Sequence, residues 1–115
     1  MRVYLIPHNG TPRPHDCGNG LYDLQHLVDG YIEPCAPAQL REFGIELLCN
    51  EEGLLKGLPC NENLYPFFFV GNLVAVGVGE DEFVSLTPKQ EMFLRSWLTM
   101  LRLDPYYEKD RGHFD

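Results

Sequence analysis

The chain has 115 residues, of which 44% are hydrophobic and 12% aromatic, so it is long enough to form one domain with its own apolar core. Its 17 acidic and 9 basic residues give a formal net charge of −8 at pH 7. Because nucleic-acid affinity comes chiefly from Lys and Arg, this charge argues against direct DNA or RNA binding unless the few bases gather on one face. The longest apolar stretch, 67–70, is too short to cross a membrane, and the N-terminus lacks a signal-peptide pattern.

Hydrophobic periodicity and turn residues divide the first half of the chain into short elements. Residues 7–20 are rich in Pro and Gly and are predicted to form an irregular loop. Residues 38–43 fit either one helical turn or a loop. We expect strands over 3–6, 31–33 and 45–49, and a short helix over 21–29 that Gly30 ends.

In the second half, residues 54–58 are predicted to return as a strand antiparallel to 45–49, after a polar turn. Further strands are expected over 67–70, 72–78 and 83–86. The clearest element is an amphipathic helix that starts at Thr87 and runs through Arg102, since Thr87, Pro88 and Gln90 form a capping-box pattern. The element order predicts a single α+β domain over 1–115, with a mainly antiparallel sheet and a loosely held tail at 104–115.

The sequence offers little support for catalysis. Cys17 shares the first loop with His8 and His15, which would allow a Cys–His nucleophile or part of a zinc site. For both hypotheses, chance proximity in the sequence is the simpler explanation. The four cysteines have no zinc-knuckle spacing and suit free thiols in a reducing cytoplasm. No P-loop, dinucleotide fingerprint or nucleophile elbow occurs, so we expect no cofactor and lean against an enzyme.

One segment predicts a small-molecule pocket. Gly18, Asn19 and Gly20 precede the helix at 21–29, where backbone N–H groups and the helix dipole favour an anion. The side chains expected to complete a nucleotide or phosphate pocket are Arg13, His15, Tyr22 and Tyr31. The plainer alternative is a glycine-rich turn that only leads into the helix.

Several segments, taken in order, resemble a known family. They are Leu24–Glu33 (LQHLVDGYIE), Cys49–Leu54 (CNEEGL), Gly57–Asn61 (GLPCN), Gly71–Gly77 (GNLVAVG) and Phe83–Thr87 (FVSLT). This set is similar to a small domain-of-unknown-function family carried by phages and bacterial mobile elements. The resemblance covers roughly residues 3–90 and supplies no catalytic residue. It implies an accessory protein in the cytoplasm of a bacterial host.

Two functions from different classes follow as hypotheses, both non-enzymatic and suited to counter-defence. The first is sequestration of a small nucleotide-derived immune signal in the predicted pocket, which the protomers of a homo-oligomer would share. The second is inhibition of a host defence protein through nucleic-acid mimicry, with acids supplied by Glu51, Glu52, Glu80, Asp81 and Glu82. A structural domain with no separate ligand is the third option. The first predicts a concave basic pocket, whereas the second predicts acids along one exposed face.

Overall fold

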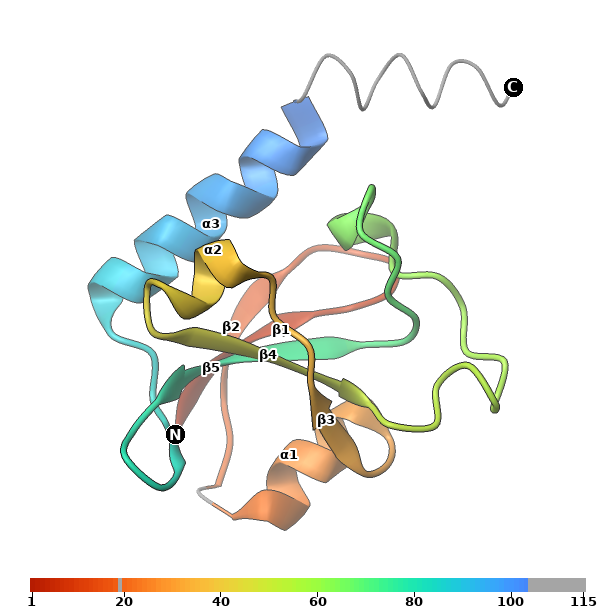
Figure 1. Ribbon diagram of the computed structural model, residues 1–115, viewed down its shortest axis with the longest axis horizontal. Helices are drawn as coiled ribbons and strands as arrows, with labels where there is room; N and C mark the ends of the chain where they lie inside the picture. The colour runs from red at the N-terminus through yellow and green to blue at the C-terminus, as the bar shows by residue number, and fades with distance from the viewer. Residues whose placement is uncertain (19, 104–115) are drawn as a thin grey trace.

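The computed structural model describes residues 1–18 and 20–103 and shows an antiparallel sheet with helices on both faces (Figure 1). The strands are β1 (Arg2–Ile6), β2 (Arg13–Asp16), β3 (Ile32–Pro34), β4 (Ile45–Asn50), β5 (Leu73–Val78) and β6 (Phe83–Val84). The helices are α1 (Leu21–Val28), α2 (Ala38–Arg41) and α3 (Pro88–Leu103), with a 3-10 turn, η1 (Glu62–Leu64). The predicted α+β class, with an antiparallel sheet, a short early helix and a C-terminal helix, is confirmed.

The sheet has the order β2-β1-β5-β4-β3, and β6 pairs with the end of β5. Every pairing is antiparallel. Ala75 of β5, for example, lies opposite Tyr4 of β1 on one side and opposite Leu47 of β4 on the other. β5 therefore lies in the middle, which agrees with its sequence Leu-Val-Ala-Val-Gly-Val and its near-complete burial. β2 and β3 form the two edges of the path, so within residues 1–18 and 20–103 each of these strands pairs on one side only.

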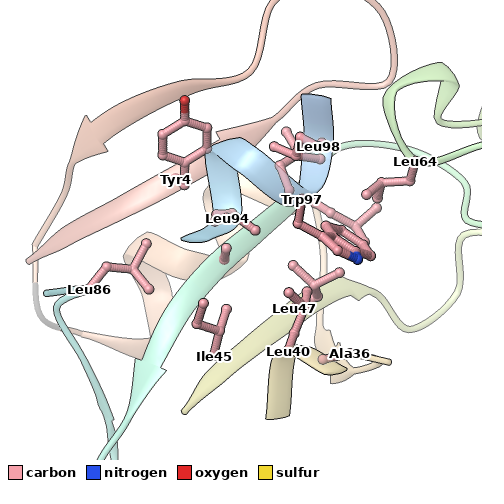
Figure 2. Packing of buried hydrophobic residues seen from close by; sticks show 13 residues of the cluster. Tyr4, Ala36, Leu40, Ile45, Leu47, Leu64, Leu86, Leu94, Trp97 and Leu98 are labelled. Carbon is pink, nitrogen blue, oxygen red and sulfur yellow. The ribbon is translucent and has the colours of Figure 1, made fainter. Parts of the chain in front are cut away.

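Alternating residues of the central strands fill two separate cores. On one face, Ile45, Leu47 and Ala75 pack with Leu40 of α2 and with Leu94, Trp97 and Leu98 of α3 (Figure 2). On the other face, α1 packs against the sheet and forms a second core. The buried residues of this core are Val3, Leu5, Leu24, Val28, Leu48, Val74 and Val76. Since each face buries its own apolar set, α1 and α3 are held on opposite sides of the sheet (Figure 1).

The capping box of the last helix is confirmed. The Gln90 N–H donates to Thr87 Oγ1 at 3.1 Å, and the Thr87 N–H donates to Gln90 Oε1 at 3.0 Å. Two N–H groups that a helix start leaves without partners are thereby satisfied. The predicted looseness of 104–115 concerns residues outside the described part of the chain.

Three predicted segments differ from the structure. Residues 13–16 form strand β2 rather than loop, because an edge strand needs no apolar alternation and tolerates Pro14. Residues 54–58 form no strand, since their N–H groups bond locally, for example Lys56 to the Glu52 carbonyl at 2.9 Å. Residues 67–70 contribute only a bridge between Val70 and Cys60, and Phe67 and Phe69 instead pack beside the α3 core.

Candidate functional site

The described residues of the predicted ligand pocket come from both edges of the sheet and from α1. Arg13 and His15 belong to β2 at one edge of the sheet, and the Arg13 guanidinium bonds the nearby Thr11 carbonyl at 3.4 Å. Tyr31 immediately precedes β3, at the other edge. Tyr22 and Tyr31, however, line one cleft together. Among the described residues of the predicted pocket, Tyr22 and Tyr31 thus share a cleft, whereas Arg13 and His15 lie in the strand at the opposite edge of the sheet from β3. Ligand binding by these residues stays a prediction.

The start of α1 already carries an acidic side chain. Gly20 is the N-cap and has no side chain to cap the helix, while Asp23 lies in the first turn. A Cβ placed on Gly18 would collide with the Asp23 carboxylate, so glycine is needed there to admit it. This carboxylate occupies space that an anionic ligand at the helix N-terminus would require. Asn19 lies outside the described residues, and anion binding by Gly18 or Gly20 stays a prediction.

The cleft at the C-terminal end of α1, here called the tyrosine cleft, has a volume of about 380 Å³. Tyr22 and Tyr31 stand 79% and 65% exposed, so their rings are available to a partner. The remaining lining consists of Gln25, His26, Asp29, Gly30, Glu52 and Lys56. Two aromatic rings beside two carboxylates suit a cationic or planar group.

Asn50 holds the two walls of the tyrosine cleft together. Its buried side-chain amide donates to the carbonyls of Val28 and Asp29 at 3.1 and 3.0 Å, and so satisfies the end of α1. Its Oδ1 accepts from the Glu52 N–H at 2.8 Å, which fixes the turn after β4. One amide thus positions both Glu52 and the helix end.

Lys56 reaches the same helix end. Its Nζ lies 3.2 Å from the position that a Gly30 Cβ would occupy, so the missing side chain of Gly30 gives the ammonium room. A cation near a helix C-terminus is favoured by the helix dipole. The attraction between the ammonium and the helix C-terminus therefore accounts for the position of Lys56 without any ligand.

The cleft at the N-terminal end of α1, here called the acidic cleft, has a volume of about 540 Å³. Its lining is Leu21 and Leu24 of α1, Val78, Gly79 and Phe83, and the three acids Glu80, Asp81 and Glu82. The acids lie in the turn between β5 and β6, closed by a bond from the Gly79 N–H to the Glu82 carbonyl at 2.8 Å. All three are exposed, as are Leu21 and Val78.

The two predicted acidic groups lie at opposite ends of the sheet. β4 ends at Asn50, just before Glu51 and Glu52, whereas the antiparallel β5 runs the other way and ends before Glu80. Helix α1 crosses between them and contributes to both clefts. Among the described lining residues of the two clefts there are five carboxylates and a single lysine. We call this surface, made of the tyrosine cleft and the acidic cleft, the α1 face.

The candidate chemistry of the first loop is weak. Burial raises the pKa of the Cys17 thiol, against the thiolate character that a nucleophile requires. Among the described residues, no group of three His, Cys, Asp or Glu side chains could hold a metal ion. Within the same residues, no helix is both long and apolar enough to cross a membrane.

Sequence reasoning missed His26 and Lys56 as cleft residues. The position of Lys56 depends on how the turn after β4 folds onto α1, and a strand was predicted there instead. The acids of both turns were identified from the sequence, although the helix joining them into one surface was not.

Neither the curated proteins nor the solved structures contain a match to this chain. A family model does match it, over residues 1–101, which is most of its length. The ordered sequence segments also resemble a family of domains of unknown function, so the two findings agree at that level. The chain therefore belongs to the family described as domain of unknown function DUF3846.

Proposed function

We propose that this protein is a non-enzymatic binding protein whose α1 face docks on a basic protein surface of the kind that holds nucleic acid. The observation that supports this most is the charge of the α1 face, where five carboxylates are set against one lysine. Such a surface repels phosphate and attracts Arg and Lys side chains. It favours the acidic inhibitor over the sequestering pocket.

The exposed aromatic and apolar side chains strengthen the proposal. Leu21 is 56% exposed and Tyr22 is 79% exposed, beside the acids of both clefts. Tyrosines are enriched in protein interfaces, and their rings attract guanidinium and ammonium groups. The C-terminal end of α1 adds partial negative charge to the tyrosine cleft. An arginine side chain of the partner would meet aromatic faces and carboxylates there.

The biological setting belongs to the same proposal. The resemblance of the ordered sequence segments to proteins of phages and mobile elements favours counter-defence, in which the partner is a host protein that binds nucleic acid. Occupying that basic surface would block it without any chemical reaction. A stoichiometric inhibitor of this kind acts in the bacterial cytoplasm and requires no cofactor.

The test measures binding of an oligoarginine peptide by isothermal titration calorimetry at two salt concentrations. In the test variant, Glu80→Gln and Glu82→Gln remove two charges from the acidic cleft. In the control variant, Glu42→Gln and Glu62→Gln remove two charges from exposed positions, one beside α2 and one in η1. Both elements pack in the core that contains α3, on the face of the sheet opposite α1. We expect the test variant to lose several-fold more affinity than the control, and to lose salt dependence. Equal losses would reject the α1 face as the binding surface.

A small nucleotide-like ligand is the second candidate, and the observation in its favour is the pairing of two exposed tyrosines with Lys56 in one cleft. The rings could stack on a base while the ammonium meets a phosphate. Titration with a cyclic dinucleotide compares Lys56→Met with Lys89→Met, an exposed lysine in α3. Sequestration predicts binding that only Lys56→Met weakens, and absence of binding to the unaltered protein would reject this ligand class.

A further inference from the structure

Two cysteines that are distant in sequence lie side by side in the sheet. Glu33 of β3 pairs with Cys49 of β4, and the Cys35 N–H bonds the Leu47 carbonyl at 2.9 Å, continuing the same ladder. Cys35 and Cys49 are thus diagonal neighbours on one face, which is the α3 side, where both pack against the core. Their thiols are close enough to interact through a side-chain hydrogen bond, and the Cys49 thiol also donates to the Glu33 carbonyl at 3.5 Å.

The pair lies at an edge of the sheet, and both thiols are free and partly exposed. Cys49 lines a cleft of about 370 Å³ together with Glu33, Leu54, Phe68 and others, and Leu54 and Phe68 are each 70% exposed. In the part of the chain that the structure describes, β3 pairs on one side only, so its backbone can shift more readily than that of a central strand.

The two thiols are electrostatically unequal. The hydrogen bond from Cys35 lowers the pKa of Cys49, although burial and Glu33 oppose the effect. The same hydrogen bond raises the pKa of Cys35 far above its ordinary value, and burial raises it further. Cys49 is therefore the better nucleophile, and Cys35 becomes reactive once Cys49 is modified and the hydrogen bond is lost.

We infer that Cys35 and Cys49 form a reversible redox site that a low-molecular-weight disulfide of the glutathione type converts to an intramolecular disulfide. The Cys49 thiolate attacks one sulfur of the reagent, forms a mixed disulfide and releases one thiol. Cys35 then gives up its proton, attacks the Cys49 sulfur and releases the second thiol. Two electrons pass from the protein to the reagent, and the two thiol protons end on the two released molecules.

The experiment treats the reduced full chain with glutathione disulfide, alkylates the remaining thiols and maps the cysteines by peptide mass spectrometry. The expected product has lost the mass of two hydrogens and contains a Cys35–Cys49 cross-link, with Cys17 alkylated. Exposed Cys60 serves as the internal control, because its β-bridge pairs it with Val70 rather than with a cysteine, and it should stop at a glutathione adduct. A cross-link that joins other cysteines, or full alkylation of both Cys35 and Cys49, would overturn the proposal.

A Cys35→Ser variant separates the two steps. In this variant, Cys49 should retain one glutathionyl group, since no second thiol can displace it. The unaltered chain should regain all four thiols after addition of a dithiol reductant, and circular dichroism establishes that the variant is folded. Absence of the Cys49 adduct in a folded variant would also contradict the proposed order of attack.

Discussion

Replacement of Asn50 by Ala tests whether one buried amide organises the tyrosine cleft. The side chain is 5% exposed and makes three hydrogen bonds, to Val28, Asp29 and Glu52. Each such hydrogen bond contributes about 1 kcal/mol net to stability, and a buried carbonyl left without a partner costs about as much or more. We therefore expect Asn50→Ala to lower the free energy of unfolding by about 3 kcal/mol. The largest part of this loss comes from the helix carbonyls that remain unsatisfied.

Urea unfolding followed by the fluorescence of Trp97, the one tryptophan in the sequence, measures this loss. For a domain of this size, about 3 kcal/mol lowers the midpoint by about 1–3 M urea, with the slope unchanged. The control is Asn9→Ala, an exposed loop residue, which should change stability by less than about 0.5 kcal/mol. A loss below about 1 kcal/mol for Asn50→Ala would refute the reasoning, because the helix end would then be satisfied without the amide.

Three further predictions concern stability. Thr87→Ala removes the N-cap acceptor of α3 and should cost about 1 kcal/mol in the same urea assay, and Thr87→Ser should restore most of it. Leu47→Ala empties a fully buried position and should cost about 2–5 kcal/mol, whereas Leu55→Ala, at a residue 88% exposed, should change unfolding little. Burial is the main cause that raises the pKa of the Tyr4 hydroxyl above 10.0 in the folded protein. The protonated hydroxyl therefore contributes fully to the free energy of unfolding below pH 10.0, and this contribution is lost as the pH rises through the higher pKa of the folded state. Tyr4→Phe should therefore flatten the alkaline part of a stability-against-pH curve, and an unchanged slope would contradict this.

The elements that the sequence predicted well are those with a local signal. α1 and α3 have apolar residues at helical spacing, and α3 has in addition its Thr87–Gln90 cap. β4 and β5 have strong apolar runs that are fully or nearly buried. In each case the periodicity alone determines which side chains can be buried.

The errors fall where pairing partners are distant. β2 forms because β1 offers it a free edge, and nothing in Arg-Pro-His-Asp signals a strand. Leu54 and Leu55 suggested a strand, yet the turn that contains them bonds to itself and leaves both side chains exposed. Tertiary contacts outweigh local preference in both segments.

The same contrast applies to the candidate sites. Tyr22 and Tyr31 come together because α1 and β3 are consecutive and joined by a tight turn, so sequence reasoning could place them near each other. The meeting of Glu80–Glu82 with the start of α1 depends on the sheet order, which the sequence does not reveal. The proximity of Cys35 to Cys49 follows from the antiparallel register of strands 31–33 and 45–49 once the first strand is continued two residues beyond its predicted end.

The central claim is that the α1 face binds basic protein surfaces, and backbone amide NMR of the isotope-labelled protein titrated with an oligoarginine peptide tests it most directly. We predict that saturable shifts concentrate at Tyr22, Tyr31, Glu52 and the turn 80–82, and that they weaken as salt is raised. Shifts concentrated on α2 and α3, or spread evenly over every exposed acid, would contradict the account.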